Sequence, residues 1–551
     1  MSGGQAAATS SPIGRSSAIM AAGTAVSRVL GFVRNALLVS AIGVTGMAAN
    51  TFDLANKLPN MVYAVIAGGA LNVILVPLIV KALRRRDAQD RVNRLVTFTG
   101  AILLLVTIVL TICSALLITL VAGDAWTDDQ RALGITFSLW CMPQLFFYGM
   151  YTILGQVLNA RSQFGPFMWA PVLNNVVSIV GFGLFIALWG THRAGSPLAD
   201  PAAWSGAQIT VLAGTATLGV AAQAIILVRP LARGGFRFRL AWDPRGIGLR
   251  TSGKVALWTL GGVVLDQVGV LITTRIATTA DTVATVGGEV AGNMAYSQAL
   301  MIYLLPHSLV TVSIATALFT SISTAAQAGR TDQVRHDLSH GIRTVGVFTV
   351  IAGTVLVVLA EPALRALIPS MTPDGAAAVA PVLVAMSLGL VPFGAMVLMK
   401  WVFFAYEDGQ TVFWLQVPVF AVLVLGSVAS MWWLPAQWWV VGIGASLTLS
   451  NVAGVAARAR GLSLLLGGVD GAAIVRTHVR AFVAAAVAAA VGVLVRSALP
   501  DASASWGASV VTCVVVGAVM ALVYYVGLRL MKVREIDFLR RTLVRVVRRG
   551  R

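Results

Sequence analysis

Residues 95–122 read LVTFTGAILLLVTIVLTICSALLITLVA and contain no charged side chain. An α-helix rises 1.5 Å per residue, so a helix that crosses a bilayer needs about 20 mostly apolar residues. This stretch meets that length and exceeds what a buried helix of a water-soluble domain needs. It predicts a transmembrane helix, and the rest of the chain repeats the pattern.

The composition extends this interpretation to the whole chain. Of 551 residues, 58% are hydrophobic and 11% are charged, whereas soluble domains average about 45–50% apolar and about 25% charged residues. These values exclude a soluble enzyme, a secreted scaffold and a disordered protein. Cys113, Cys141 and Cys513 lie in apolar runs without paired spacing, which indicates small buried side chains and no disulfide framework or metal site.

The apolar stretches predict an all-α polytopic membrane protein with about 14 transmembrane helices. They are 17–43, 50–80, 95–122, 133–158, 168–190, 206–229, 252–279, 291–322, 342–368, 376–404, 411–433, 437–457, 479–497 and 506–530. Residues 1–16 are polar and lack a cleavage site before the first stretch, so we expect a cytoplasmic tail and no secretory signal.

The positive charges predict the orientation. The net charge is +19, and cytoplasmic loops of membrane proteins collect Lys and Arg. One alternating set of loops holds 30 of the 40 basic residues, and the other set, with its helix margins, holds four. The basic set comprises Arg15, 81–94, 161, 229–254, 330–343, 458–480 and the tail from 532. Both termini are therefore predicted to be cytoplasmic, which requires an even number of helices. The charge serves topology, and no nucleic-acid partner is expected.

The basic tail, 532–551, allows two interpretations. Ile536, Leu539, Leu543 and Val547 lie at helical spacing between basic residues, which is typical of an amphipathic helix on anionic lipid. A solvated basic tail is the alternative.

A few charged residues fall inside the predicted spans, where each costs at least about 2.5–3.5 kcal/mol and marks a transport pathway or a paired site. Arg28 and Arg34 lie in the first span, about 120° apart around the helix and about 9 Å apart along it. They point to one wide cavity if the helix bends at Gly31. Alternatively, Arg34 snorkels to an interface.

The second span begins NTFDLANKLPN, in which Asn50, Asp53 and Lys57 share one helix face. Asp53 and Lys57 form an acid-to-base pair four residues apart. Mutual neutralisation and a polar cavity wall are both compatible with this pattern. Pro59 follows and predicts a kink.

Asp266 and Arg275 lie in the seventh span, about two and a half turns apart and therefore on opposite faces. We expect each to have a partner on another helix or water in a cavity. For both Asp266 and Arg275, a partner that serves only the structure and a functional role are equally compatible with the sequence. Lys400 lies near the cytoplasmic end of the tenth span, where snorkelling explains it equally well.

The sequence offers no pattern for covalent chemistry. Five histidines form no HExxH or other ligand set, and no P-loop is present, so we expect neither an enzyme nor direct ATP drive. Two other classes of membrane protein are disfavoured. A membrane glycosyltransferase would need a cluster of acidic residues or histidines near the membrane, which we do not find. A scaffold for assembling other proteins would not need the arginines that lie in the bilayer core.

Weak self-similarity at an offset of 243–249 residues predicts two parallel six-helix lobes facing a central cavity. ILVPLIVKALRRRDAQDRV resembles ALFTSISTAAQAGRTDQVR, and Pro143 pairs with Pro392. The predicted parts are a tail at 1–16, an N-terminal lobe at 17–230, a basic loop at 231–251, a C-terminal lobe at 252–460, two further helices at 461–531 and a basic tail at 532–551.

Several stretches together resemble the MurJ (MviN) family of lipid II flippases. They are SRVLGFVRNALLVSAIG (27–43), NTFDLANKLPNMVYAVIAGGALNVILVPLI (50–79), GQVLNARSQFGPFMWAPVLNN (155–175), LPHSLVTVSIATALF (305–319) and FFAYEDGQTVF (403–413). The pairing of SRxLGFxR with ANxLPN in the next span is specific to that family. The wider group of multidrug and polysaccharide exporters shares the two-lobe fold.

The resemblance implies a function. Such proteins move the undecaprenyl-diphosphate-linked peptidoglycan precursor, lipid II, from the inner to the outer leaflet of the bacterial plasma membrane by alternating access. An exporter of another polyprenyl-linked glycan and a multidrug exporter of the same fold are the alternatives. The resemblance implies lipid II and membrane lipids as partners, contact with the cell-wall machinery, and no cofactor. Coupling to the membrane potential and coupling to a monovalent cation are both compatible with it.

The resemblance also assigns residues. Arg28 and Arg34 match the first-helix arginines of the family and are expected to bind the diphosphate, with Lys57 as the next candidate. The family's acidic position in the second helix is Asn50 here, and Asp53 lies one turn along. Relatives carry basic residues just after LPN and in the eighth helix, whereas 61–64 and 296–306 are uncharged here. We expect Arg275 to take over part of that role. Asn50, Asp53 and Asp266 are the expected polar or gating residues of the cavity.

Overall fold

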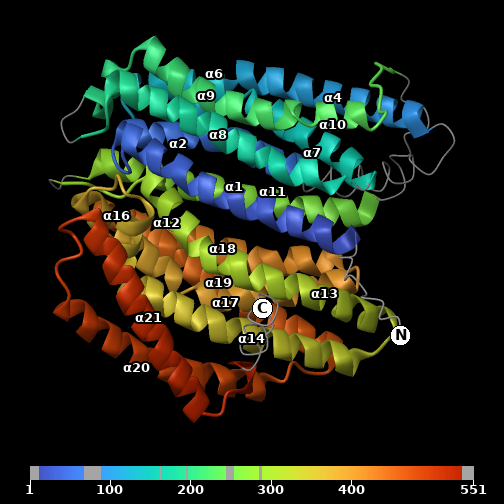
Figure 1. Ribbon diagram of the computed structural model, residues 1–551, viewed down its shortest axis with the longest axis vertical. Helices are drawn as coiled ribbons and strands as arrows, with labels where there is room; N and C mark the ends of the chain where they lie inside the picture. Colours follow the sequence, from blue (N-terminus) through green and yellow to red (C-terminus); the bar gives the residue numbers. More distant parts are fainter. Residues whose placement is uncertain are drawn as a thin grey trace, which may run out of the picture. The chain divides into compact units, whose positions relative to one another are not determined.

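The computed structural model describes residues 12–67, 88–123, 125–161, 163–193, 197–242, 253–284 and 288–536. Within these ranges all regular structure is helical (Figure 1). The helices up to residue 233 are α1 (Pro12–Ile42), α2 (Met47–Ile66), α4 (Ala88–Ile112), α5 (Ser114–Val121), α6 (Asp128–Cys141), α7 (Gln144–Ala160), α8 (Phe164–Trp189), α9 (Gly206–Ile225) and α10 (Val228–Arg233).

The later helices begin with α11 (Gly253–Val283) and α12 (Asn293–Pro306). A π-helical turn, His307–Thr311, joins α12 to α13 (Val312–Gln327). They continue with α14 (Thr331–Val358), α15 (Ala360–Leu367), α16 (Pro373–Ser387), α17 (Leu390–Ala405), α18 (Gly409–Trp433), α19 (Trp439–Leu466), α20 (Gly471–Ala498) and α21 (Trp506–Leu530).

Eleven helical spans in the described ranges are long and apolar enough to cross a membrane. They become twelve if α16 and α17, which meet at a 46° bend, are counted as one broken span. This confirms the predicted all-helical polytopic membrane protein. The predicted stretch 133–158 is divided between α6 and α7, each shorter than 18 residues, and 50–80 runs beyond the described part of α2. The number fourteen therefore stays a prediction.

The chain divides into two compact units. Unit 1 comprises Met1–Ile42, Ala55–Thr119 and Asp128–Gly253, and unit 2 comprises Gly43–Leu54, Leu120–Thr127 and Lys254–Arg551. The division falls inside α2, whose first eight residues group with unit 2. The lobe boundaries expected from the sequence stay a prediction.

In unit 1, α1 packs closely along α8 through a face of small residues. Gly23, Ser27 and Gly31 recur every four residues, which places them on one side of the helix. A Cβ at Gly23 would lie 2.9 Å from the Trp169 ring, and Asn175 of α8 donates from Nδ2 to the Ser27 carbonyl oxygen at 2.8 Å. The side of α1 that faces α8 is thereby fixed.

In unit 2, α20 and α21 pack against α14 rather than standing apart. Tyr524 donates its hydroxyl to the Val347 carbonyl oxygen at 2.7 Å, and the two helices share one apolar cluster with α14. Just beyond α21, Glu535 is 7% exposed and pairs with Arg343 at 2.9 Å. The predicted amphipathic tail lies largely outside the described residues, which end at residue 536.

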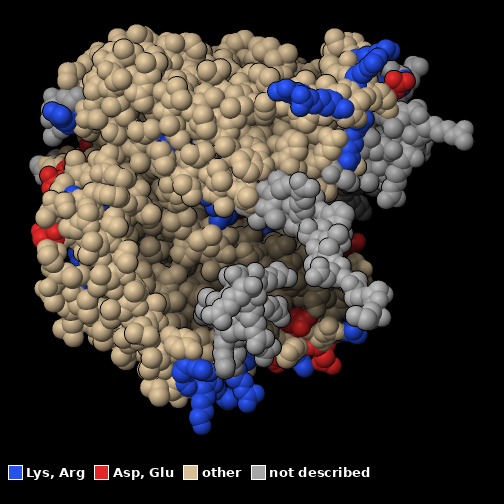
Figure 2. All heavy atoms as spheres, in the orientation of Figure 1, with Lys and Arg blue, Asp and Glu red and all other residues tan. Residues whose placement is uncertain are grey.

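The surface has the character expected of a protein in lipid. Large apolar side chains point outward from long helices, among them Leu105 at 62% exposure and Leu494 at 68%. Figure 2 shows that most atoms on the displayed face belong to neither acidic nor basic residues. Exposed apolar area on this scale would be unfavourable in water and is favourable in the hydrocarbon of a bilayer.

Candidate functional site

The two arginines of α1 have different surroundings within unit 1. Arg28 is exposed and lies about 100° around the helix from Ser27, the residue that contacts α8, so its side chain projects away from that contact. Arg34 is half-buried, and its charge interacts with the Tyr148 side chain of α7. The two arginines, which the sequence predicts to point in different directions around α1, therefore have different neighbours.

A polar stripe on α7 supplies the surroundings of Arg34. Gln144, Tyr148 and Thr152 recur every four residues along an otherwise apolar helix. The Tyr148 hydroxyl donates to Gln144 Oε1 at 3.4 Å. The Tyr63 ring of α2 lies 5.4 Å from the Tyr148 ring, and the Tyr63 and Thr152 hydroxyls share a hydrogen bond. The sequence prediction did not include these residues, although their helical spacing was the signal that would have revealed them.

Lys57 lies half-buried in the part of α2 that belongs to unit 1. Its neighbour Asn56 accepts a hydrogen bond from Gln144 Nε2 at 3.0 Å, so this part of α2 adjoins the polar stripe of α7. Pro59 lies inside the helix and has no N–H for the Ala55 carbonyl oxygen. α2 is therefore weakened one turn beyond the boundary between its two portions.

The beginning of α2 belongs to unit 2, where Asn50 forms the N-terminal contact of α12. Asn50 is fully buried, and its Oδ1 accepts from the backbone N–H of Met294 at 2.8 Å. Its Nδ2 donates to the carboxylate of Asp281 on α11. A Cβ at Gly292 would lie 2.3 Å from Asn50 Nδ2, so only glycine permits this close approach. Asn50 thus satisfies a free N–H at the beginning of α12.

Asp53, one turn along α2, also contacts α12. It accepts from Asn293 Nδ2 at 2.9 Å and from the Ser297 hydroxyl at 2.6 Å. A carboxylate beside a helix N-terminus is favoured by the helix dipole. Asn50 and Asp53 are therefore brought together on one helix end, and both side chains have partners that a rearrangement of α2 would have to release.

Arg275 has a structural partner. It is exposed, and its Nη1 donates to the Leu120 carbonyl oxygen at 3.3 Å, near the C-terminal end of α5. A guanidinium is favourable at a helix C-terminus because the last carbonyls lack partners within the helix. Asp266 is not its partner, as the spacing predicts, because Asp266 bonds to α18.

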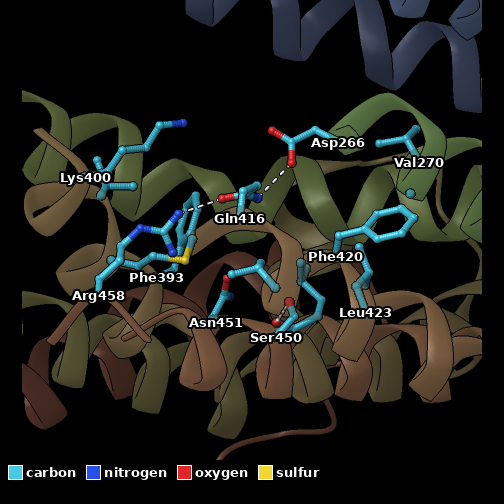
Figure 3. A pocket seen from close by; sticks show the side chains of 15 residues that line it. Asp266, Val270, Phe393, Lys400, Gln416, Phe420, Leu423, Ser450, Asn451 and Arg458 are labelled. Carbon is cyan, nitrogen blue, oxygen red and sulfur yellow. Dashed lines mark hydrogen bonds between the residues drawn. The ribbon is translucent and has the colours of Figure 1, made fainter. Parts of the chain in front are cut away.

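Asp266 opens onto a cavity of about 280 Å³ in unit 2, bounded by α11, α17, α18 and α19 (Figure 3). Its Oδ1 accepts from Gln416 Nε2 at 2.8 Å. Gln416 Oε1 in turn accepts from Arg458 Nη2 at 2.6 Å. Lys400 lines the same cavity as Asp266. The sequence predicted that Lys400 could snorkel to the membrane surface, and the cavity gives its charge a carboxylate nearby as well.

The sequence prediction was wrong about Arg458, which it counted with a basic cytoplasmic loop. α19 continues through residue 466, nine residues beyond the predicted end of the span, and Arg458 is 1% exposed inside it. The segment NVAGVAARARG is rich in alanine, and this helix preference was the available signal. Among the described residues there is no group of three or more His, Cys, Asp or Glu arranged to hold a metal ion.

The comparison with protein families decides the assignment. The sequence profile described as "Lipid II flippase MurJ" matches residues 38–522. The chain belongs to the lipid II flippase MurJ family. The predicted family is thereby confirmed, and the matched residues include ANKLPN at 55–60.

Two curated relatives illustrate how far the MurJ likeness extends. The probable lipid II flippase MurJ of Vibrio cholerae is 27% identical over 419 residues, covering 72% of this chain and 73% of the relative. That of Rhizobium meliloti is 26% identical over 396 residues, covering 70% and 69%.

Solved structures support the fold. A structure titled "Lipid II flippase MurJ, inward closed conformation" superposes with a TM-score of 0.70 at 17% identity, covering 93% of this chain and 99% of that one. An inward-facing multidrug resistance transporter of the MATE family and MOP superfamily gives 0.63 at 15% identity, covering 79% and 94%. This MurJ-family chain therefore has the fold shared by MurJ and MATE proteins.

Proposed function

We propose that this chain moves lipid II from the inner to the outer leaflet of a bacterial plasma membrane by alternating access, as a secondary-type transporter without covalent chemistry. The observation that carries the proposal is the family match over residues 38–522. The absence of a P-loop and of HExxH in the sequence agrees with it.

The proposed headgroup contacts in unit 1 are Arg28, Arg34 and Lys57. A lipid diphosphate is a permanent anion, and guanidinium groups bind phosphate oxygens through two parallel hydrogen bonds. Arg28 supports this role because it projects away from α8 and has no hydrogen bond or ion pair to another described residue. Arg34, beside the polar stripe of α7, would hold a second phosphate oxygen or a sugar hydroxyl.

In unit 2, Arg275 is the proposed additional cation for the headgroup, since its guanidinium is exposed and uses one N–H on Leu120. Asn50 and Asp53 are the proposed gating residues. Their bonds to α12 stabilise one position of the beginning of α2, and a transport cycle would break and remake them. Asp266 is the proposed polar residue of the cavity in Figure 3.

The excess of basic residues in one set of loops supports a location in the bacterial plasma membrane with both termini cytoplasmic. We also propose that the cell-wall synthesis machinery is a partner, as the resemblance to lipid II flippases implies.

The decisive experiment measures lipid II in each leaflet. In a bacterium depleted of its own MurJ-family flippase, expression of this chain should restore lipid II to the outer leaflet. An empty vector is the control, and membrane insertion is verified by fractionation. If the chain inserts and lipid II stays in the inner leaflet, the flippase function is rejected. If another polyprenyl-linked glycan moves instead, the chain is an exporter of that glycan.

A further inference from the structure

The cavity of Figure 3 contains both a carboxylate and two basic side chains. We propose that Arg458, positioned by Gln416, is the permanent counter-ion of Asp266, so that this cavity takes up no exchangeable monovalent cation. The inference deepens the proposed flippase function, because it means that transport does not depend on sodium binding at Asp266. It rests on that function only for its transport assay.

The first argument is the direction of the hydrogen bonds. Gln416 donates from Nε2 to Asp266 Oδ1 at 2.8 Å and accepts at Oε1 from Arg458 Nη2 at 2.6 Å. A carboxylate only accepts and a guanidinium only donates, so a single orientation of the amide satisfies both partners. The amide dipole is therefore aligned between the negative and the positive group, and Gln416 connects two charges that do not touch.

The second argument is that the charge of Arg458 is permanent and fixed in place. A guanidinium keeps its proton in proteins. Arg458 is 1% exposed, and its Nη1 also donates to the Gly454 carbonyl oxygen at 3.3 Å. A Cβ at position 454 would lie 3.0 Å from that nitrogen, so Gly454 provides the space that the guanidinium occupies. A mobile ion leaves its site during transport, whereas this cation is attached to α19.

The third argument is the charge balance. Lys400 lines the same cavity, and Figure 3 shows its side chain extending into the space beside Asp266. Its ammonium group lies 5.7 Å from the Phe404 ring, where an aromatic face attracts a cation. One carboxylate thus faces two fixed cations. A sodium ion entering the cavity would be repelled by both in a medium of low dielectric constant.

The experiment uses the purified full-length protein in liposomes that contain lipid II, with sodium replaced by N-methyl-D-glucamine at constant chloride and constant membrane potential. The wild-type protein is expected to flip lipid II at the same rate in both media and to bind no radioactive sodium above background. Wild-type flipping that falls at least about tenfold without sodium, or saturable sodium binding that Asp266→Asn removes, would overturn the inference.

A variant tests the counter-ion directly. Arg458→Gln removes the cation that Gln416 connects to Asp266 and leaves Lys400 to balance the carboxylate. Lys400 has no hydrogen-bonded link through Gln416, so flipping should fall at least about tenfold in the sodium-free medium and recover in part when sodium is added. Arg460→Gln, two residues along α19 on an exposed side chain, is the matched control and should remain insensitive to sodium. Activity of Arg458→Gln that equals the wild type in both media would contradict the assignment.

A second variant distinguishes loss of charge balance from misfolding of Arg458→Gln. Asp266→Asn with Arg458→Gln removes both charges, and should recover sodium-independent flipping relative to Arg458→Gln alone. Failure of this double variant to improve on a folded Arg458→Gln would count against the pairing. If no protein flips lipid II in either medium, the proposed function fails, and sodium binding to the wild-type protein still decides whether the cavity takes up the ion.

Discussion

Arg28 and Arg458 are both arginines in apolar helices, and their surroundings differ in a way that separates two uses of an intramembrane charge. Arg28 is exposed on α1 and has no hydrogen bond or ion pair to another described residue. Arg458 is buried on α19 and has hydrogen bonds to Gln416 and Gly454. A charge inside the membrane marks a pathway or a paired site, and Arg458 is of the paired kind, whereas Arg28 has no such partner among the described residues. The predictions below test this distinction.

The largest effect is expected from Arg28→Ala. Loss of a bidentate charge-assisted contact to a diphosphate should reduce flipping about tenfold to a hundredfold while the protein still inserts, because no described residue depends on Arg28. Lipid II in the outer leaflet is the measurement, and Arg28→Lys should retain part of the activity through its charge. Full complementation by Arg28→Ala would remove Arg28 from the headgroup site.

Asn50→Ala should have the next largest effect. It removes the acceptor of the Met294 N–H and one donor to the Asp281 carboxylate, and a buried group left without its partner costs about 1–3 kcal/mol. The contact between α2 and α12 should weaken, and a cysteine at Ser297 should react faster with a membrane-impermeant maleimide. The background chain has Cys113, Cys141 and Cys513 replaced by alanine, and Asn50 intact is the control. An unchanged labelling rate would contradict the gating role.

Gly454→Ala should lower stability by about 1–3 kcal/mol, since overpacking a tight site costs about that much. The added Cβ would lie 2.4 Å from the Met396 sulfur and 3.0 Å from Arg458 Nη1. The melting temperature in detergent is the measurement. Gly471→Ala, at a position where a Cβ meets no atom within 4 Å, is the control. Equal melting temperatures for the two variants would mean that Arg458 is not tightly held.

Arg275→Gln should give the smallest effect. Glutamine can still donate to the Leu120 carbonyl oxygen but carries no charge, so stability should change by less than about 1 kcal/mol. If Arg275 contributes to the headgroup site, flipping should fall several-fold at an unchanged melting temperature. Unchanged flipping would place Arg275 with Arg458, as a charge that serves the fold.

The sequence predicted what depends on local composition. Long apolar runs identified the helices because lipid demands both length and low polarity. The spacing of Asn50 and Asp53 correctly placed both on one helix face, which the structure directs to α12. The polar stripe of α7 was also readable from its spacing.

The rest depends on contacts between distant residues. Asp266 and Gln416 are 150 positions apart, and no spacing rule relates them. The sequence analysis assigned Arg458 to a loop because a basic residue near the end of an apolar run usually marks the end of a span. Helix α19 instead continues beyond the apolar run. The partner of Arg275 is a backbone carbonyl, which every residue offers and which sequence patterns therefore do not distinguish.

The small-residue face of α1 has a mechanical consequence. Because Gly23 lies close to the Trp169 ring and the Ser27 carbonyl oxygen accepts from Asn175 of α8, rotation of α1 about its own axis is hindered. If the two helices tilt together, the direction in which the Arg28 side chain points changes with the tilt of α8. A bulky substitution on the small-residue face of α1 would therefore turn the Arg28 guanidinium toward a different neighbour, although the arginine itself is unchanged.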